Sequence, residues 1–316
     1  MAFDMSSKST DAFIARTQAL ATRFRKQRPL RAGSLLVTML GDSIAPRGGS
    51  IALSSLIRLA EPFGLTDRLV RTSVGRLAND RWVTSTKIGR ASFYTLTRHG
   101  RVLFAKATQR IYGVSPDEWD GNWTLIIVPP ELKKMRGDIR EELSWLGWGQ
   151  LAPGVFAHPT YQREELHAWL AEFRAAERLV VVDAKSITST DAQLVSIGWN
   201  LGELGRRYRR FIGMFSAVND ALARRGGDLH GETCFVLRTL LLHEYRKIHL
   251  RDPLLPPSLL PPDWPGAEAY ALVGTLYSRA FAASEQHLSE VCRTLDGELP
   301  LPTADVFDRF GGISRA

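Results

Sequence analysis

The sequence of 316 residues is long enough for two or three domains, and its 44% hydrophobic and 23% charged residues exclude a chain that is disordered throughout. No apolar run approaches the ~20 residues that span a bilayer, and two cysteines, Cys234 and Cys292, exclude a disulfide framework. We therefore expect a protein of the reducing cytoplasm that does not contact a membrane.

Positive charge is concentrated in the N-terminal third of the chain. Residues 1–112 contain 19 Lys/Arg and 6 Asp/Glu, a net charge of +13, whereas residues 113–316 contain 22 and 27, a net charge of −5. This asymmetry predicts a polyanion-binding module joined to an acidic remainder, although a basic surface that only confers solubility is an alternative. Residues 1–32 are predicted to form a basic arm or a short amphipathic helix near nucleic acid.

Residues 33–112 are predicted to form a winged helix-turn-helix DNA-binding domain. Three helices are followed by a hairpin with a basic tip at Gly89-Arg90 and then a fourth helix. The signals are candidate helix caps at Ser34, at Ser54 or Ser55 and at Thr66, a break at Gly41-Asp42, a turn at residues 62–65, and β-rich runs at residues 82–88 and 91–97.

The third helix, from Thr66 to about Asn79, separates apolar from basic residues. At 100° per residue, Val70, Val74 and Leu77 lie on one side, where they can hold the helix on its domain. The arginines on the opposite side can reach guanine edges or phosphates in the major groove, although a solvated face would look alike. The predicted DNA-binding residues are Arg47, Ser54, Thr66, Arg68, Arg71, Thr72, Arg76, Lys87 and Arg90; Arg47, Lys87 and Arg90 are expected at phosphate or in the minor groove.

Residues 113–190 alternate strands and helices in a way that predicts a small ferredoxin-like domain. The expected elements are strands at residues 123–128 and 178–183, helices at residues 131–146 and 164–176, and an extended glycine-rich stretch at residues 147–156. Asp183 ends a buried strand, where catalytic acids often lie. It has no acidic companion there, so a structural cap or salt bridge is the favoured interpretation.

Residues 191–316 are predicted to form a helical effector and oligomerisation domain. Apolar residues recur at 3–4 spacing from Leu194 to Leu222, which predicts one helix ~43 Å long whose seam packs against another helix. That seam is either the core of an intramolecular bundle or a homodimer interface. Further helices are expected over residues 234–250 and 267–295, separated by a stiff, proline-rich connector at residues 253–265.

Few residue patterns point to catalysis, and we assign no catalytic residue, metal or cofactor. His243-Glu244 begins like a zinc-protease motif, but Lys247 takes the place of the second histidine. Basic clusters in the helical domain are either solvated or an anion site for a phosphorylated ligand. The candidate effector-binding residues are Arg206, Arg207, Tyr208, Arg210, Arg246 and Lys247.

Several segments together resemble the repressors of phenylacetate-degradation operons, the PaaX-like family. The resemblance is carried by residues 34–42, 48–49, 62–65 with 68–74, 94–97, 146–154 and 238–256. It implies a winged-helix N-terminal domain, a central ferredoxin-like domain similar to CRISPR-associated dimeric nucleases, and a helical C-terminal domain. It also implies repression of aromatic-acid catabolism, relieved by an aryl-acetyl-CoA thioester such as phenylacetyl-CoA.

We therefore expect an α+β multidomain protein that is not an enzyme: a homodimeric repressor that binds a double-stranded DNA operator and a small acyl-CoA inducer. The alternative is a metal-dependent nuclease that cuts nucleic acid with its central domain. A nuclease of this kind needs paired acidic metal ligands, and only Asp183 is well placed.

Overall fold

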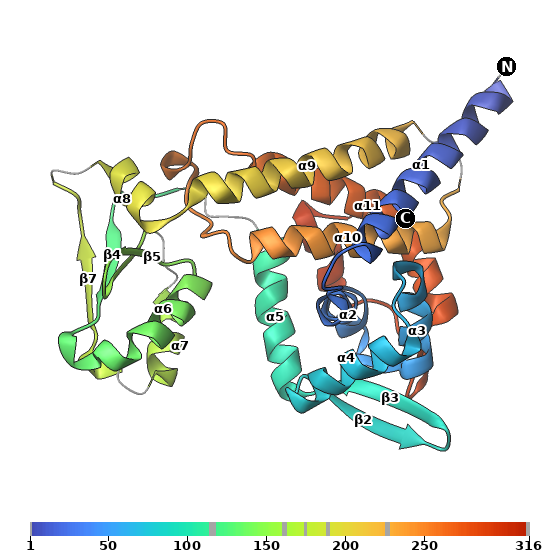
Figure 1. The fold of residues 1–316 in the computed structure, drawn as a ribbon, viewed down its shortest axis with the longest axis horizontal. Coiled ribbons are helices and arrows are strands. Elements are labelled where there is room, and N and C mark those ends of the chain that lie inside the picture. Colours follow the sequence, from blue (N-terminus) through green and yellow to red (C-terminus); the bar gives the residue numbers. More distant parts are fainter. Residues whose placement is uncertain are drawn as a thin grey trace. The chain divides into compact units, whose positions relative to one another are not determined.

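The computed structural model describes residues 2–113, 118–159, 163–173, 176–187, 190–224 and 228–313. The chain forms two compact units (Figure 1). Unit 1 contains residues 1–113, 210–247 and 267–316, and unit 2 contains residues 114–209 and 248–266. The predicted DNA-binding segment thus shares one unit with most of the C-terminal helices, because long-range contacts join segments that lie far apart in the sequence.

The N-terminal part of unit 1 consists of five helices and a small antiparallel sheet. The helices are α1 (Ala2–Arg25), α2 (Ala32–Met39), α3 (Leu53–Ala60), α4 (Asp67–Asn79) and α5 (Arg98–Tyr112), and the strands are β1 (Ser50–Ala52), β2 (Val83–Ile88) and β3 (Ala91–Leu96). The strand order is β1-β3-β2. Strands β2 and β3 form a hairpin in which Ile88 pairs with Ala91.

Two expectations about the first helix are wrong. Ser34 does not cap it, because α2 already begins at Ala32 and the side chain of Ser34 accepts a hydrogen bond from Arg246. Gly41-Asp42 does not end the helical path, which continues as a π-helical turn (Leu40–Ile44) and a 3-10 turn (Ala45–Arg47). Gly48 and Gly49 end it, and both adopt left-handed φ angles that favour glycine.

The helix predicted from Leu194 to Leu222 is in fact two helices, α8 (Asp191–Gly198) and α9 (Leu201–Ala223). Trp199 is extended (φ −137°, ψ 138°), and its indole N–H donates to the carbonyl of Gly147 at 2.9 Å. The side-chain oxygen of Asn200 then accepts the N–H of Glu203 at 3.1 Å. A tertiary contact and a new cap therefore interrupt a seam whose spacing is continuous in the sequence.

The two remaining helices lie near their predicted positions, although the last one ends at Val291 rather than at residue 295, and the elements that follow it were not predicted. The elements are α10 (Gly231–His249), α11 (Gly266–Val291), strands β8 (Arg293–Thr294) and β9 (Gly297–Glu298), and a 3-10 segment (Ala304–Gly311). Unit 1 has an aromatic core in which Phe63 lies edge-on to Phe24 and to Phe235, with ring centroids 6.3 and 6.1 Å apart. These contacts join α1 and α10 to the turn before α4.

Unit 2 is built on a four-stranded antiparallel sheet of order β5-β6-β4-β7. Its elements are β4 (Trp123–Ile127), a 3-10 turn (Pro130–Met135), α6 (Arg136–Trp145), β5 (Gly149–Ala152), β6 (Val155–His158), α7 (Arg163–Glu172), a 3-10 turn (Ala176–Arg178) and β7 (Val180–Ala184). The stretch expected to be extended at residues 147–156 lies mostly in the β5–β6 hairpin.

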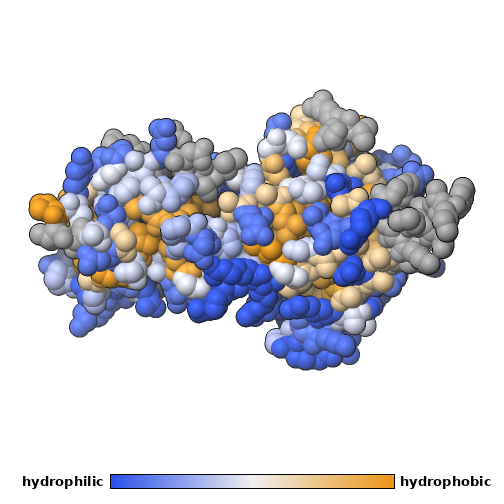
Figure 2. Space-filling model, turned by 90° about the horizontal axis from the view of Figure 1, so that it is seen from above, coloured by the Kyte–Doolittle hydropathy of each residue, from blue (hydrophilic) through white to orange (hydrophobic). Residues whose placement is uncertain are grey.

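Two apolar clusters hold this sheet. Ile126 and Phe156 pack with Leu143 of α6 and Trp169 of α7. Trp123 and Ala157 belong to the second cluster, which contains residues of α8 and the proline-rich connector. The surface in Figure 2 is a mosaic of hydrophilic and apolar residues. Among the helices that the structure describes, none has the length and apolar character that a membrane span requires.

Candidate nucleic-acid interface and the ionic network behind it

Helix α4 is anchored at its start and along one face. Gly64, with φ +73°, closes the preceding turn, and the hydroxyl of Thr66 accepts the N–H of Leu69 at 3.3 Å, which makes Thr66 the N-cap as predicted. Val70 and Val74 are fully buried. The sequence therefore fixes which face of the helix is left for a partner.

The predicted base-contacting residues of α4 are all exposed: Arg68, Arg71, Thr72 and Arg76. Arg71 forms an ion pair with Asp67, one turn earlier, and both side chains are more than half exposed. The hydroxyl of Thr72 donates to the carbonyl of Arg68 at 2.8 Å. The guanidinium groups of Arg68 and Arg76 have no hydrogen-bond or ion-pair partner among the side chains that the structure describes, so they are available to an anionic partner.

The β2–β3 hairpin adds two cations at its tip. Lys87 and Arg90 are exposed on either side of Gly89, whose φ of +58° allows the tight connection. In Figure 1 this hairpin extends beyond the neighbouring helices of unit 1, and α4 contacts β2 directly. The hairpin and the exposed face of α4 thus offer cations from adjacent elements.

Arg47 is the clearest correction to the predicted DNA-binding set. Its side chain is 1% exposed, forms an ion pair with Glu285 and donates to the carbonyl of Ser43 at 2.6 Å. It cannot reach a phosphate without breaking this burial. Ser54 is exposed, but α3 has Ala52 at its N-cap position and no side-chain cap. Its neighbour Ser55 is buried, and its hydroxyl donates to the carbonyl of Val291 and accepts the N–H of Arg293.

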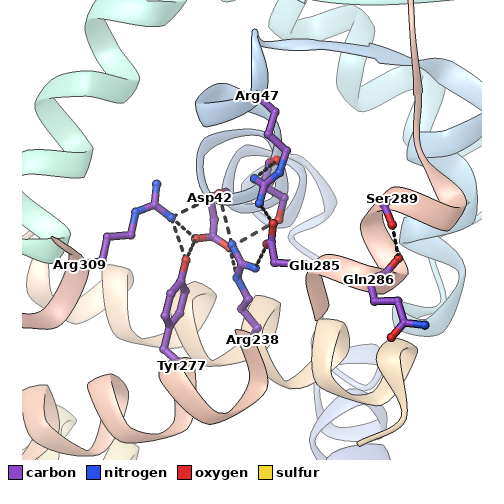
Figure 3. A network of polar contacts seen from close by, with 9 residues as sticks. Asp42, Arg47, Arg238, Tyr277, Glu285, Gln286, Ser289 and Arg309 are labelled. Atoms are coloured by element: carbon purple, nitrogen blue, oxygen red, sulfur yellow. Dashed lines mark hydrogen bonds and ion pairs between the residues drawn. The ribbon is translucent and has the colours of Figure 1, made fainter. Parts of the chain in front are cut away.

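Asp42, in the π-helical turn after α2, is the centre of a buried ionic network (Figure 3). Asp42 accepts hydrogen bonds from Arg238 of α10 at 2.7 Å and from Arg309 and Tyr277 at 2.8 Å each. Tyr112, at the end of α5, donates to the same carboxylate at 2.8 Å. One side chain thus connects the π-helical turn to four other elements.

A second carboxylate extends this network. Glu285 of α11 accepts from Arg238 at 2.5 Å and pairs with Arg47. Arg238 also lies over the ring of Tyr277, 4.8 Å from its centroid, and Arg309 lies 4.2 Å from the ring centroid of Tyr112. We name Asp42, Arg47, Arg238, Glu285 and Arg309 the Asp42 network.

The electrostatics around Asp42 favour the charged form of its carboxylate. Burial acts to raise the pKa of Asp42, but Arg238 and Arg309 outweigh it, so the pKa falls below its ordinary value. Burial raises the pKa of Tyr277 to about 12, which keeps its hydroxyl a donor. Sequence reasoning missed this network; the signal that could have found it is Arg238, a lone charge in the otherwise uncharged run from Cys234 to Leu242.

Of the six predicted effector-binding residues, three lie in unit 2 (Arg206, Arg207 and Tyr208) and three in unit 1 (Arg210, Arg246 and Lys247). Tyr208 is 1% exposed and donates to Asp252 at 2.7 Å, so it is part of the folded core. Arg246 donates to Thr38 and Ser34 at 2.8 Å, and Lys247 pairs with Glu244 at 2.9 Å. Arg206 pairs with the nearby Glu203 at 2.8 Å. Arg207 lines a cavity in unit 2, and Arg210 lines a different one in unit 1.

Asp183 has a structural contact in the sheet. It lies opposite Thr124, whose hydroxyl donates to its carboxylate at 3.0 Å. The described residues include no group of three or more His, Cys, Asp or Glu side chains placed to hold a metal ion.

Comparison with known proteins covers nearly the whole chain. Residues 31–100 match the family model of the PaaX-like protein, residues 116–195 that of the PaaX protein central Cas2-like domain, and residues 199–290 that of the PaaX-like protein C-terminal domain. The chain is 36% identical over 290 residues to the transcriptional repressor PaaX of Escherichia coli (strain K12), covering 90% of this chain and 92% of that protein.

A solved structure, the uncharacterized protein Rv0674 from Mycobacterium tuberculosis, aligns with a TM-score of 0.48 and 22% identity, over 73% of this chain and 90% of that one. The curated relative is a regulator rather than an enzyme. The three family models and the identity along the chain lead to one conclusion: this protein belongs to the PaaX family.

Proposed function

We propose that this protein is a dimeric transcriptional repressor of an aromatic-acid catabolic operon of the phenylacetate type, released from its operator by an aryl-acetyl-CoA thioester. The observation that carries the proposal is the exposed cationic face of α4 beside the hairpin tip. It offers Arg68 and Arg76 without partners among the described side chains, in a chain of the PaaX family.

Residues 33–112 act as a winged helix-turn-helix in this proposal. The order of helices, the three-stranded sheet and the capped α4 support this assignment. Helix α4 enters the major groove, where Arg68, Arg71, Thr72 and Arg76 contact bases or phosphates. Lys87 and Arg90 contact phosphate or the minor groove, and Thr66 and Ser54 lie near the sugar-phosphate backbone of the DNA.

Residues 113–190 form a ferredoxin-like central domain that also carries the dimer interface, and residues 191–316 supply the effector function. The β-α-β-β-α-β chain order and the antiparallel strand order β5-β6-β4-β7 support the first assignment. Residues 1–32 serve as the basic N-terminal segment.

Capture of fragmented genomic DNA from an organism that encodes this chain, followed by sequencing, tests the proposal. We expect enrichment of a few promoter fragments next to aromatic-acid catabolic genes, and loss of that enrichment when phenylacetyl-CoA is added. Uniform recovery of all fragments, or enrichment that no acyl-CoA thioester affects, would contradict it. Cleavage of the fragments in Mg²⁺ or Mn²⁺ would support the nuclease alternative instead.

A further inference from the structure

A carboxylate lies among the exposed cations of α4. Asp67 is the first residue of this helix, and its side chain and that of Arg71 are both more than half exposed. The two residues are about one helical turn apart, so they lie on the same side of the helix. The phosphates of a duplex attract the arginines of α4 and repel an acidic side chain beside them. Asp67 therefore opposes binding to DNA in general.

The contact between Asp67 and Arg71 involves both carboxylate oxygens. Arg71 donates from Nε to one oxygen and from Nη2 to the other, the second at 3.3 Å. The hydrogen bond and the charge of Asp67 raise the pKa of Arg71, and Tyr94 of the nearby strand β3 acts in the same direction. The guanidinium of Arg71 is thus oriented by its own helix and held as a cation.

The helix does not depend on this pair to form. Thr66 caps α4, and the buried Val70 and Val74 hold it on the domain. An exposed ion pair adds little to stability, because water and salt screen both charges. Its larger effect is on binding, because Arg71 cannot donate the same two N–H groups to Asp67 and to DNA at once.

Release of Arg71 to DNA leaves the carboxylate of Asp67 without this partner. At the surface of a duplex the carboxylate then either stays unpaired near phosphates or accepts a hydrogen bond from a base. In the major groove, the exocyclic amino group of cytosine is the donor that suits an aspartate, and guanine offers the two acceptors that suit an arginine. A sequence that supplies both bases compensates both side chains, whereas other sequences leave one of them unpaired.

We propose that Asp67 is a specificity-determining residue: it retains Arg71 on non-operator DNA, and at the operator it accepts from a cytosine amino group while Arg71 binds a guanine. The inference deepens the proposed function, on which it rests, by naming bases that α4 selects. Four residues along a helix span ~6 Å, successive base pairs lie ~3.4 Å apart, and the two side chains converge. The two bases therefore belong to the same or to adjacent base pairs.

Binding of the full-length protein to the operator and to a shuffled duplex of the same length tests the proposal. Asp67→Asn removes the charge and frees Arg71. We expect this variant to bind the shuffled duplex ~3–10-fold more tightly, with a slope of log affinity against log salt concentration that is steeper by about one unit. The ratio of operator affinity to shuffled-duplex affinity should fall by about 10-fold or more.

The matched control is Asp80→Asn, which makes the same change of charge at the other end of α4. Asp80 is exposed and follows the last residue of the helix. This variant should leave the affinity ratio and the salt slope close to their wild-type values. An affinity ratio in Asp67→Asn that equals the ratio in Asp80→Asn would overturn the proposal.

Replacing the operator base pairs one at a time tests the assignment of the bases. The wild-type protein should discriminate at a C·G pair that Asp67→Ala no longer distinguishes, at or next to the pair where Arg71→Ala loses discrimination. The double variant D67A/R71A should lose no more discrimination than the larger of the two single losses, because the side chains act as one unit.

The base-pair profile separates the possible outcomes. An equal loss of affinity for every operator variant in Asp67→Ala would show a purely structural role and overturn the proposal. Loss of discrimination at an A·T pair instead would overturn the assignment to cytosine. A wild-type protein that prefers no duplex over another would mean that the proposed function itself fails, and this result is visible before any variant is compared.

Discussion

At the scale of single residues, Asp42 determines how the N-terminal segment is attached to the C-terminal helices. Its carboxylate is 4% exposed and faces two guanidinium groups that are also buried. A buried pair contributes little net stability compared with apolar residues of the same volume, but removing one partner leaves an uncompensated charge. The network therefore acts chiefly to specify one arrangement of these segments.

The first prediction follows from the high cost of removing one partner of a buried ion pair. Asp42→Asn leaves Arg47, Arg238 and Arg309 with a single carboxylate, Glu285, so the free energy of unfolding should fall by about 3–5 kcal/mol. Urea denaturation at neutral pH measures the change. The matched control is Asp67→Asn, which removes an exposed pair on α4 and should have little effect on stability. A decrease no larger than in the control would show that the network does not secure the fold.

His243 provides a second prediction, on pH. Burial, followed by Lys247 and Arg246, lowers the pKa of this imidazole to about 3. Between pH 6.5 and 3 the unfolded chain therefore binds a proton that the folded chain does not, so stability falls as the pH decreases through this window. At pH 5 the loss from this group is about 2 kcal/mol.

Stability against urea at several pH values tests this role. His243→Leu should flatten the decrease between pH 7 and pH 5, whereas the exposed His230→Gln should leave it unchanged. Equal slopes for wild type and His243→Leu would exclude His243 as the source. Only the slope is compared, because the substitution also removes the 3.3 Å contact with Thr38.

At the scale of elements, local signals predicted more than long-range ones. Thr66, the apolar face of α4 and the hairpin around Gly89 depend on neighbouring residues, and the structure has them at the predicted positions. The break at Trp199 depends on a contact with Gly147, which no local pattern contains.

The burial of Arg47 similarly depends on Glu285, 238 positions away. The sequence therefore predicted the exposed cations of the site and missed the network that supports them. An arginine in a turn looks the same in sequence whether it faces solvent or a distant carboxylate.

A third prediction concerns base contacts by α4. Arg68→Ala or Arg76→Ala should cost about 1–3 kcal/mol of operator affinity and relax sequence preference at one base-pair position. Arg71→Ala should act similarly, because in the wild-type complex Arg71 exchanges its ion pair with Asp67 for a contact with DNA. Competition binding against operators with single base-pair changes measures both effects. Unchanged affinity and preference in all three variants would show that α4 does not contact the bases.

The hairpin leads to a different expectation. Lys87→Ala should weaken binding to every duplex alike. It should also lower the slope of log affinity against log salt concentration by about one unit, as expected for the loss of one phosphate contact. Arg206→Ala, which removes an exposed arginine of unit 2, is the control and should leave the salt dependence unchanged. A sequence-dependent loss in Lys87→Ala would reassign Lys87 from phosphate to base contact.

At the scale of the whole molecule, the apolar seam from Leu201 to Leu222 is used inside the chain. Leu204, Phe211, Phe215 and Val218 are buried without any second copy. This favours the bundle-core alternative for the seam. By contrast, edge strand β7 leaves Val180, Val181 and Val182 46%, 37% and 38% exposed. Among the strands that the structure describes, β7 has a neighbour on one side only, and an apolar edge of this kind is suited to pairing with another strand, so the central sheet is the better candidate for homodimerisation.

Light scattering on purified protein tests this assignment. We expect twice the mass of one chain at micromolar concentration, because two-fold pairing would let two copies of the proposed winged domain contact a palindromic operator. Val180→Lys should shift the protein towards the monomer, whereas Ile197→Lys, at an exposed position of α8, should not. A monomeric wild type, with and without DNA, would contradict dimerisation, and a dimer sensitive only to Ile197→Lys would move the interface to α8.

The most direct test of the whole account is a titration of operator duplex with the full-length protein, with and without phenylacetyl-CoA. The account predicts specific binding that R68A/R76A abolishes, and an affinity that decreases as thioester is added while affinity for non-specific DNA changes little. Operator binding that R68A/R76A leaves intact, or that stays constant at saturating thioester, would contradict it.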